Sequence, residues 1–412
     1  MSMSGKKNIF TTIKKKFPLL TYHKELAYFD SAATSQKHEQ VLAAMDMFYR
    51  RDYGAVHRGI YRLAEQATEL YEQARATVAR FIQAQPDEII FTSGATEGIN
   101  FVVTAWASRH LNKGDEIILT MVEHHANLLP WYDLAQKKGL VIKHVRLSKD
   151  GSLDYQQYES FLSSKTKLVS FVHCSHVLGF YTPAREMIAK AHAVGARVLL
   201  DVAQSVPHKP ISVIDINPDF LVFSGHKMMG PTGIGVLYCS RTVQSEMSPY
   251  KFGGGMIADI MMTDGEVPSM RYRSAPYCYE AGTPPVAEAI GLAAAVNVFN
   301  EIDRTAQEKY ETKLMGQLLD GLNKISRVTV LGSQELIRKE GHLLSFMVKG
   351  IHAHDVASYC DQHDSAVRAG KLCAFPLFMN LDIESSVRAS LFLYNTEEDI
   401  DKLVHTLKEL VS

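Results

Sequence analysis

The chain has 412 residues, 46% of them hydrophobic and 22% charged, which is the balance of an ordinary globular protein and a length that suits two domains of unequal size. Its 44 basic and 45 acidic residues leave a formal net charge of -1, so the composition gives no reason to expect a nucleic acid or an anionic membrane as partner. Five cysteines without a Cys-x-x-Cys pair argue against a disulfide framework or a zinc ribbon, and they favour a reducing compartment.

The N-terminal segment carries lysines at positions 6, 7, 14, 15 and 16 and no acidic residue before Glu25. It contains no arginine and no small-residue cleavage site, so we predict no transit peptide and expect a cytoplasmic protein. No apolar run approaches the roughly 20 residues that cross a bilayer. We expect the residues before about Tyr22 to pack with the C-terminal part of the chain.

An amphipathic stretch, Ala64–Gln83, precedes a region in which short β-branched runs alternate with helical patterns such as Ala95–Arg109, Ala126–Lys138 and Ala184–Val194. The predicted strands are Glu88–Thr92, Glu116–Met121, Val141–Arg146, Lys167–His173, Arg197–Val202, Asp219–Ser224 and Gly233–Cys239. This alternation predicts an α/β fold with a mostly parallel seven-stranded sheet flanked by helices. Ligands of such sheets collect at the C-terminal ends of the strands.

A Gly/Pro-rich section, Pro249–Pro285, is interpreted as active-site loops and a hairpin, and a helical pattern follows at about Val286–Asn300. A smaller α+β domain is expected after it, built from Arg327–Leu331, Leu343–Val348, a helix near His354–His363, Arg388–Tyr394 and a terminal helix from Glu397. We therefore predict a large domain over residues 22–290 and a small domain over residues 1–21 and 291–412.

Lys227 is the first candidate for chemistry, because Ser224-Gly225-His226-Lys227 directly follows a predicted strand. A lysine at that edge faces the ligand crevice, and lysine bonds to carbonyl cofactors when its surroundings lower its pKa. Most loop lysines are merely solvated, but Gly230, Gly233 and Gly235 indicate a close approach of the backbone here.

Residues at the ends of other predicted strands are further candidates for the site. Asp201 ends the apolar run Leu199–Val202, where pyridoxal enzymes need a carboxylate for the pyridine nitrogen, although an Asp helix cap is an equal alternative. Thr92–Gly98 leads from a strand through a glycine turn into a helix, whose free N–H groups suit a phosphate. The adjacent His124 and His125 point in different directions and lack suitable partners, so we expect ring stacking and no metal site.

Cys373 lies in Arg368-Ala369-Gly370-Lys371-Leu372-Cys373, a polar loop with two cations that favour an exposed, reactive thiolate. An arbitrary cysteine is usually structural and buried. Cys360, inside an amphipathic helical pattern, fits that description, whereas Cys373 does not.

Several stretches together resemble a known family. They are Tyr28-Phe29-Asp30-Ser31-Ala32-Ala33, Ala55-Val56-His57-Arg58-Gly59, Ala95-Thr96-Glu97-Gly98-Ile99-Asn100, Glu123-His124-His125-Ala126-Asn127, Ser224-Gly225-His226-Lys227 with Gly230-Pro231-Thr232-Gly233, Glu280-Ala281-Gly282-Thr283-Pro284 and Arg388-Ala389-Ser390. In this order and spacing, from about Phe17 to the C-terminus, the chain resembles the group II (SUF-type) cysteine desulfurases. These are similar to selenocysteine lyases and belong to the class V aminotransferase branch of fold type I pyridoxal 5′-phosphate (PLP) enzymes.

The resemblance implies a role for each matching residue. Lys227 would bind the cofactor covalently and shuttle a proton, His124 would stack on its ring, and Asp201 would hold the pyridine nitrogen. Gln204 and His176 would lie on the ring-hydroxyl side. Thr96, Ser224 and His226 would bind the phosphate, with Thr283 reaching in from a second subunit. Arg388 would clamp the substrate carboxylate, Cys373 would accept the sulfur, and Arg368, His57 and Arg58 are further substrate-binding candidates.

The sequence departs from the family at a few positions. His176 stands where the family usually has asparagine, Lys371-Leu372 replaces a histidine-containing loop before the cysteine, and Pro285 stands where asparagine is frequent. We expect these departures to affect the catalytic rate and the choice of sulfur acceptor more than the binding of the cofactor.

The resulting hypothesis is a homodimeric PLP-dependent cysteine desulfurase. It would convert L-cysteine to L-alanine, hold a persulfide on Cys373 and supply a small sulfur-acceptor protein for iron–sulfur cluster assembly. Two alternatives stay open: a selenocysteine lyase or cysteine sulfinate desulfinase, and a catalytically silent PLP-binding assembly partner.

Overall fold

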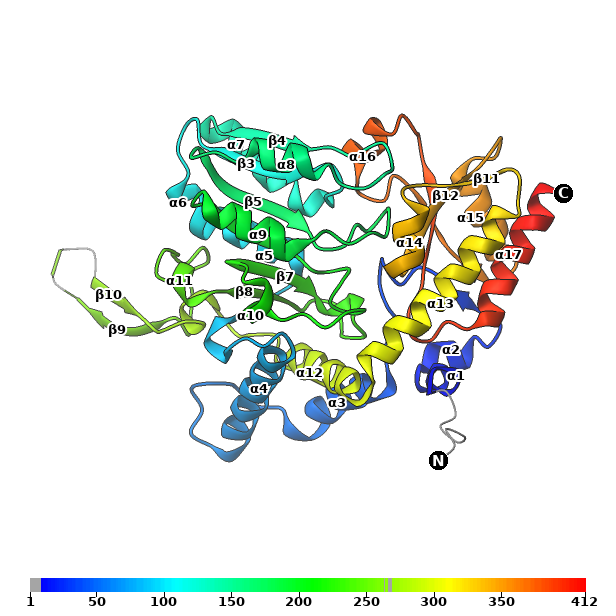
Figure 1. Ribbon diagram of the computed structural model, residues 1–412. Coiled ribbons are helices and arrows are strands. Elements are labelled where there is room, and N and C mark those ends of the chain that lie inside the picture. The colour runs from blue at the N-terminus through cyan, green and yellow to red at the C-terminus, as the bar shows by residue number, and fades with distance from the viewer. Residues whose placement is uncertain (1–8, 263, 266–268) are drawn as a thin grey trace, which may run out of the picture.

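The computed structural model describes residues 9–262, 264–265 and 269–412. Two sheets organise the chain, a seven-stranded one in its first two thirds and a four-stranded one near the C-terminus (Figure 1). Residues 1–8, which belong to the predicted small domain, lie outside the described residues.

The larger sheet has the strand order β2-β8-β7-β6-β5-β3-β4. Its strands are β2 (Ile89–Thr92), β3 (Glu116–Thr120), β4 (Val141–Val145), β5 (Thr166–Val172), β6 (Arg197–Asp201), β7 (Phe220–Ser224) and β8 (Gly235–Cys239). Only β8 runs antiparallel to its two neighbours. The predicted mostly parallel seven-stranded sheet is therefore confirmed, with every strand end within two residues of its predicted position.

Both faces of this sheet are covered, because successive residues of a strand point to opposite faces. In β3, Ile117 and Leu119 enter one hydrophobic core and Ile118 enters the other. The first core also contains side chains of α5 (Ala95–Val102) and α7 (Leu129–Lys138). The opposite core contains side chains of α4 (Arg62–Phe81), α9 (Ala184–Ala193) and α12 (Val286–Glu301).

The predicted helices are also found. The pattern Ala95–Arg109 forms one helical run, in which α5 continues through the π-helical η4 (Val103–Ala107) into α6 (Ser108–His110). The shorter helices around the large sheet are α3 (Glu39–Met47), α8 (Tyr155–Phe161), α10 (Val213–Ile216) and α11 (Arg241–Gln244). The expected hairpin is formed by β9 (Ile257–Met261) and β10 (Ser269–Tyr272), and it projects from the body (Figure 1).

The four-stranded sheet is antiparallel and has the order β11-β12-β15-β14. Its elements and helices are β11 (Val328–Val330), β12 (Leu343–Val348), β14 (Arg368–Gly370), β15 (Ser386–Ser390), α13 (Arg304–Asn323), α14 (Gln334–Glu340), α15 (Ala353–Gln362), α16 (Phe375–Asn380) and α17 (Glu397–Val411). The predicted strand Arg388–Tyr394 is wrong at both ends. The strand ends at Ser390, and the chain then turns, with the Asn395 N–H donating to the carbonyl of Phe392.

Contacts join the N-terminal helices to the C-terminal part, as expected. The ring of Phe10 in α1 (Ile9–Ile13) stacks on Tyr310 at 4.7 Å, and Lys14 forms an ion pair of 2.8 Å with Asp399. In addition, β1 (Ala27–Tyr28) pairs with β13 (Ser365–Ala366). The exact domain boundary stays a prediction, since residue 290 lies inside α12.

No helix within the described ranges is long and apolar enough to cross a membrane.

Candidate functional site

A pocket of about 230 Å³ lies beyond the C-terminal ends of β6 and β7, where the strand order predicts a ligand. It is lined by Ala32, Ala33, Ala95, Thr96, His124, Ala126, His176, Asp201, Ala203, Gln204, Ser224, His226, Lys227, Arg368, Leu372, Cys373 and Arg388. Eleven of the fourteen predicted site residues are in this lining. The structure therefore brings together, in one pocket, predicted residues that are separated by nearly 300 positions in the chain.

Lys227 ends the 3-10 turn η6 (Gly225–Lys227), which directly follows β7. The preceding carbonyl, that of His226, accepts hydrogen bonds from Thr34 Oγ1, the Ser35 N–H, Ser35 Oγ and Lys37 Nζ. These four hydrogen bonds fix the backbone from which the Lys227 side chain projects. Burial lowers the pKa of Lys227, although the Asp201 carboxylate opposes this effect. A lowered pKa increases the share of free amine, which is the reactive form towards carbonyl groups.

Asp201 is the last residue of β6, and its Oδ1 accepts the Ala203 N–H at 2.9 Å. Burial raises its pKa, while the Lys227 ammonium lowers it. A buried carboxylate of this kind gains most from a cationic partner in the pocket. Gln204 is fixed beside it, because its Nε2 donates to the carbonyl of Ala32 at 2.7 Å.

The predicted phosphate site lies at the start of α5. Ser224 Oγ accepts the Ala95 N–H at 2.9 Å and thereby joins the end of β7 to the first turn of this helix. The approach is possible because residue 235 is glycine: a Cβ there would lie 2.4 Å from the Cα of Gly94. Thr96 is exposed at the pocket wall. Burial lowers the pKa of His226 to about 4, so its ring is neutral near pH 7.

Two histidine rings, His124 and His176, pack edge to face with centroids 5.1 Å apart. His124 Nδ1 accepts the Ala126 N–H, and burial together with the Lys227 charge lowers its pKa to about 3. His176 Nε2 lies 2.9 Å from the carbonyl oxygen of Leu372, so it is the donor, and burial holds its pKa well below the usual value. His176 Nδ1 is buried without a partner in the described structure.

Arg388 points into the pocket from β15 and is only 3% exposed. Its Nη1 donates to the carbonyl of His176 at 2.9 Å, and its Nη2 donates to Asp30 at 3.2 Å. Burial lowers its pKa to about 10, and its Nε has no partner within the described residues. This free edge can bind a carboxylate, a task for which a guanidinium is suited.

Cys373 stands between β14 and α16 in a tightly held loop. Both Leu372 and Cys373 adopt left-handed backbone conformations, with φ of 49° and 55°. This costs about 1–2 kcal/mol per residue, and neighbouring contacts compensate for it. The Cys373 carbonyl accepts the His125 N–H at 2.9 Å, and His125 Nε2 accepts the Phe375 N–H at 3.0 Å. The loop therefore presents a side chain in a fixed direction, as strained functional segments do.

The chain's five cysteines are all described, and only Cys373 is exposed. Burial raises the pKa of the thiols of Cys174 and Cys239, and it raises that of Cys360 to about 12. Cys278 does not line the pocket. It lies in the core beside α5 and α7, where burial raises the pKa of its thiol.

Thr283, His57 and Arg58 are absent from the pocket lining. Thr283 lines a separate pocket of about 210 Å³, together with Ser93, Glu97 and Tyr250. The ring of His57 lies edge-on to that of Tyr277 at 5.6 Å, and Arg58 is exposed. Within one chain these three residues do not line the Lys227 pocket, and their roles stay predictions that require a second subunit.

Two residues near the site received no role from the sequence. Asp30 contacts both arginines of the pocket, at 3.2 Å from Arg388 and 3.5 Å from Arg368. Lys37 supports the His226 carbonyl, and burial lowers its pKa to about 8. Asp30 stands in one of the stretches that carry the resemblance, but no short-range pattern reveals its distant partners.

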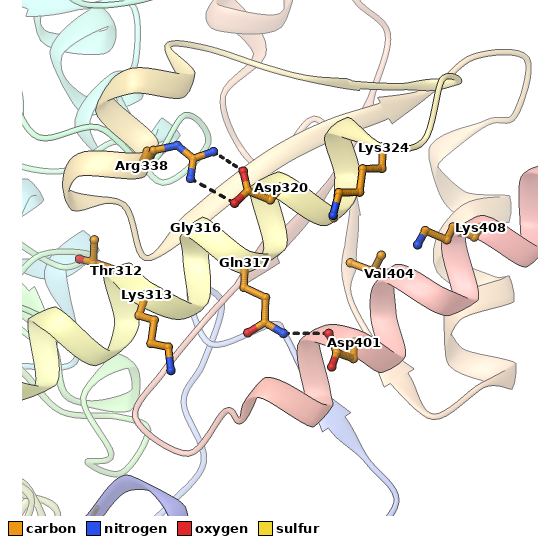
Figure 2. A pocket seen from close by; sticks show the side chains of 11 residues that line it. Thr312, Lys313, Gly316, Gln317, Asp320, Lys324, Arg338, Asp401, Val404 and Lys408 are labelled. Carbon is orange, nitrogen blue, oxygen red and sulfur yellow. Dashed lines mark hydrogen bonds and ion pairs between the residues drawn. The ribbon is translucent and has the colours of Figure 1, made fainter.

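A larger hollow of about 670 Å³ lies on α13, α14 and α17 (Figure 2). Its walls are exposed helix side chains that pair with each other, such as Arg338 with Asp320 and Gln317 with Asp401 (Figure 2). It gathers no buried titratable group and no cysteine, so the smaller pocket around Lys227 is the candidate active site.

Comparison with known proteins agrees with this geometry. The family model for class-V aminotransferases matches residues 27–403. The chain belongs to the class-V aminotransferase family. A curated relative from Halalkalibacterium halodurans, named a probable cysteine desulfurase, is 43% identical over 401 residues, which are 96% of this chain and 97% of the relative.

Solved structures give the same result for the fold of this class-V chain. A cysteine desulfurase from Thermococcus onnurineus is 38% identical, with a TM-score of 0.92 and 97% coverage of both chains. The cysteine desulfurase CsdA from Escherichia coli is 35% identical, with a TM-score of 0.89 and 98% coverage of both chains. These findings confirm the predicted family and fold, and the names of the relatives agree with the predicted activity.

Proposed function

We propose that this protein is a PLP-dependent cysteine desulfurase that transfers the sulfur of L-cysteine to Cys373. The observation that carries this proposal is the exposed thiol of Cys373 on the wall of the pocket that also holds Lys227 and Asp201. The relatives named cysteine desulfurase, which match nearly the full chain, support the same activity.

The residues of the pocket fit PLP. Lys227 supplies the amine, Asp201 a buried carboxylate for the pyridine nitrogen, and Thr96, Ser224 and His226 line the place for the phosphate. His176 Nδ1 and Arg388 Nε are buried polar atoms without partners, as expected where a polar ligand completes the site. When bound, PLP acts as an electron sink that makes the Cα proton of an amino acid acidic.

Residues of the chain itself bind the substrate, transfer the proton and accept the sulfur. Arg388 holds the substrate carboxylate, and Lys227 takes the proton from Cα. The Cys373 thiolate attacks the substrate sulfur, so that an S–S bond forms while the C–S bond breaks. The electrons of the broken bond stay on Cβ, which takes up a proton. Lys227 returns a proton to Cα, alanine leaves, and the persulfide remains on Cys373.

The first test is release of L-alanine from L-cysteine by the purified holoenzyme, with and without a reductant that removes the persulfide. We expect sustained turnover with the reductant and about one turnover per site without it. No alanine under either condition would contradict the proposal and favour the silent assembly partner.

Arg388→Lys is expected to weaken the apparent affinity for L-cysteine by about tenfold or more, because a charged hydrogen bond contributes roughly 1.5–3 kcal/mol and lysine cannot form the guanidinium fork. Steady-state kinetics measure the effect. Unchanged KM and kcat would remove Arg388 from the substrate site.

We also expect a homodimer. Thr283 and His57 lie outside the pocket of their own chain, and exposed apolar side chains such as Tyr49, Tyr53 and Ile60 gather near His57 in the sequence. Two-fold dimers are the most frequent assembly among soluble oligomers. Light scattering of the holoenzyme measures the mass, and a fully active monomer would contradict this expectation.

A small sulfur-acceptor protein is the proposed partner, since an exposed persulfide on Cys373 needs a recipient, and iron–sulfur cluster assembly is the proposed use. The cytoplasm is the proposed location, because its reducing conditions keep a free thiol such as Cys373 available.

A further inference from the structure

The loop that carries Cys373 is held by a histidine from another part of the fold. Phe375 is the first residue of α16, and the first N–H groups of a helix have no partner within that helix. His125 Nε2 accepts the Phe375 N–H at 3.0 Å, and the backbone N–H of His125 donates to the Cys373 carbonyl at 2.9 Å. His125 therefore binds both ends of the short segment 373–375.

Aromatic contacts strengthen this attachment. The ring of His125 stacks on that of Phe375, with centroids 5.2 Å apart and planes inclined by 27°. Lys371 Nζ lies 4.8 Å from the centre of the Phe375 ring, a distance at which a cation is attracted to an aromatic face. Because Phe375 is 49% exposed, these ring contacts supplement its limited burial and help to hold the start of α16 in place.

His125 itself stands on a rigid support. Asn127, two residues later, is buried; its Nδ2 donates to Glu123 Oε2 at 2.7 Å, and its Oδ1 accepts a hydrogen bond of 2.6 Å from Ser170 Oγ. Glu123 is also buried and accepts the N–H of Val172, the last residue of β5, at 3.1 Å. These hydrogen bonds fix the loop between β3 and α7 to the large sheet, and His125 is part of that loop.

The protonation state of His125 suits such an attachment. Its Nε2 accepts a hydrogen bond from Phe375, so in the neutral ring the proton is on Nδ1. Burial lowers the pKa of His125, which favours the neutral ring and keeps Nε2 free to accept. Protonation of Nε2 would remove the acceptor.

The conformation of the loop needs outside support. Leu372 and Cys373 both have a positive φ, and residues other than glycine keep that conformation only where their surroundings impose it. We propose that His125 is a positioning residue for Cys373, because its ring nitrogen and ring face hold the strained loop in the conformation from which the thiol reaches the substrate sulfur. This inference rests on the proposed function and adds a residue that acts through Cys373.

The test separates the ring nitrogen of His125 from its ring face. His125→Phe keeps a ring and loses the acceptor, whereas His125→Gln keeps an acceptor oxygen and loses the ring. Three properties of the holoenzyme are measured: the dissociation constant of L-alanine by calorimetry, the single-turnover rate of alanine formation from L-cysteine, and the rate at which iodoacetamide alkylates Cys373, followed by peptide mass spectrometry.

In His125→Phe we expect the single-turnover rate to fall on the order of tenfold or more, because misplacement of a reacting group by about 1 Å can cost on the order of a hundredfold. Alkylation of Cys373 should become faster by about twofold or more, since a loosened loop opens more often to the reagent. The affinity for L-alanine should stay within about twofold of the native value, because Arg388 and Lys227 are unchanged. In His125→Gln, which restores an acceptor, the single-turnover rate should return to within about threefold of the native value.

A second variant tests the ring contacts and serves if the His125 variants do not fold. Phe375→Leu keeps the backbone N–H, and the side chain that it changes is half exposed. We expect the same opposite changes in the two rates, about threefold each, the size that fits an exposed cation–π contact. His405→Phe is the matched control, because His405 is an exposed histidine of α17 that pairs with Glu409 and does not line the pocket. All three properties should keep their native values in this control.

The outcomes separate the role of His125 from the proposed function. A native enzyme that releases alanine, with native single-turnover and alkylation rates in His125→Phe and Phe375→Leu, would overturn the role of His125 and leave the proposed function intact. Loss of L-alanine binding in His125→Phe, or equal changes in His405→Phe, would also overturn it. A native enzyme that releases no alanine would contradict the proposed function itself.

Discussion

Lys227→Ala is expected to lower turnover of L-cysteine by at least about a thousandfold, since proton transfer by a positioned group contributes roughly 10²–10⁴ and the covalent hold on the cofactor is lost as well. Lys227 is the one lysine among the described residues that line the pocket. The other cations there, Arg368 and Arg388, are guanidinium groups that cannot replace an amine in bonding to a carbonyl carbon.

The measurement has two parts. Absorption of the purified protein in the visible range reports the cofactor bound to the lysine, and an alanine assay reports turnover. Both signals should disappear in Lys227→Ala. Lys137→Ala is the matched control, because Lys137 is an exposed helix lysine that pairs with Asp133 and does not line the pocket, and it should behave as the native enzyme does. Native turnover by Lys227→Ala would refute the assignment of the pocket.

The large sheet could be predicted from the sequence because most of its strands are short apolar runs buried on both faces, with the partly exposed edge strand β4 as the exception. In β3, β7 and β8 every residue is buried, and such runs stand out between amphipathic helices. The site followed from the sheet, because Asp201 and Lys227 come at or just after strand ends that a parallel topology brings to one edge. Local sequence therefore sufficed for the residues that strands position.

Local sequence could not predict contacts between residues that are far apart in the chain. It also could not predict a helix whose buried face carries polar side chains. No helix over Arg304–Asn323 was predicted, because its buried face carries Gln307 and Glu311, which interrupt the apolar pattern. The contact of Asp30 with Arg388 joins residues 358 positions apart. Similarly, His176 was expected to contact the ring hydroxyl of the cofactor, and no short-range pattern showed that its Nε2 would bond to the Leu372 carbonyl.

This last contact links the cofactor pocket to the loop of the predicted nucleophile. His176 is tied to Leu372, and His125 is tied to Cys373 and Phe375. The two histidines belong to loops of the large sheet, whereas the cysteine loop follows a strand of the small one. We therefore regard the position of Cys373 as determined by the large sheet as much as by its own loop.

Cys373→Ser is the second variant with a large expected effect. It should abolish persulfide formation and lower alanine release from L-cysteine by at least about a hundredfold, because serine offers no thiolate and its hydroxyl is a weak nucleophile at neutral pH. Substrate binding should persist, since Arg388 and Lys227 are unchanged. The two effects together distinguish a lost nucleophile from a collapsed pocket.

Peptide mass spectrometry after anaerobic incubation with L-cysteine locates the transferred sulfur. It should map to the peptide that contains Cys373 in the native protein and disappear in Cys373→Ser. Cys278→Ser is the matched control, because Cys278 is a buried thiol whose pKa is raised by burial and which does not line the pocket. The persulfide on Cys373 should remain in this control.

The selectivity of the sulfur for Cys373 follows from access and charge together. The other four thiols are buried, where formation of a thiolate is costly, and none of them lines the pocket. Cys373 is exposed on the pocket wall, which also contains Lys227, Arg368 and Arg388. Sulfur found mainly on Cys278 would refute this assignment. Normal alanine release by Cys373→Ser would instead show that carbon–sulfur cleavage proceeds without the thiol, and the selenocysteine lyase or cysteine sulfinate desulfinase alternative would then describe the enzyme better.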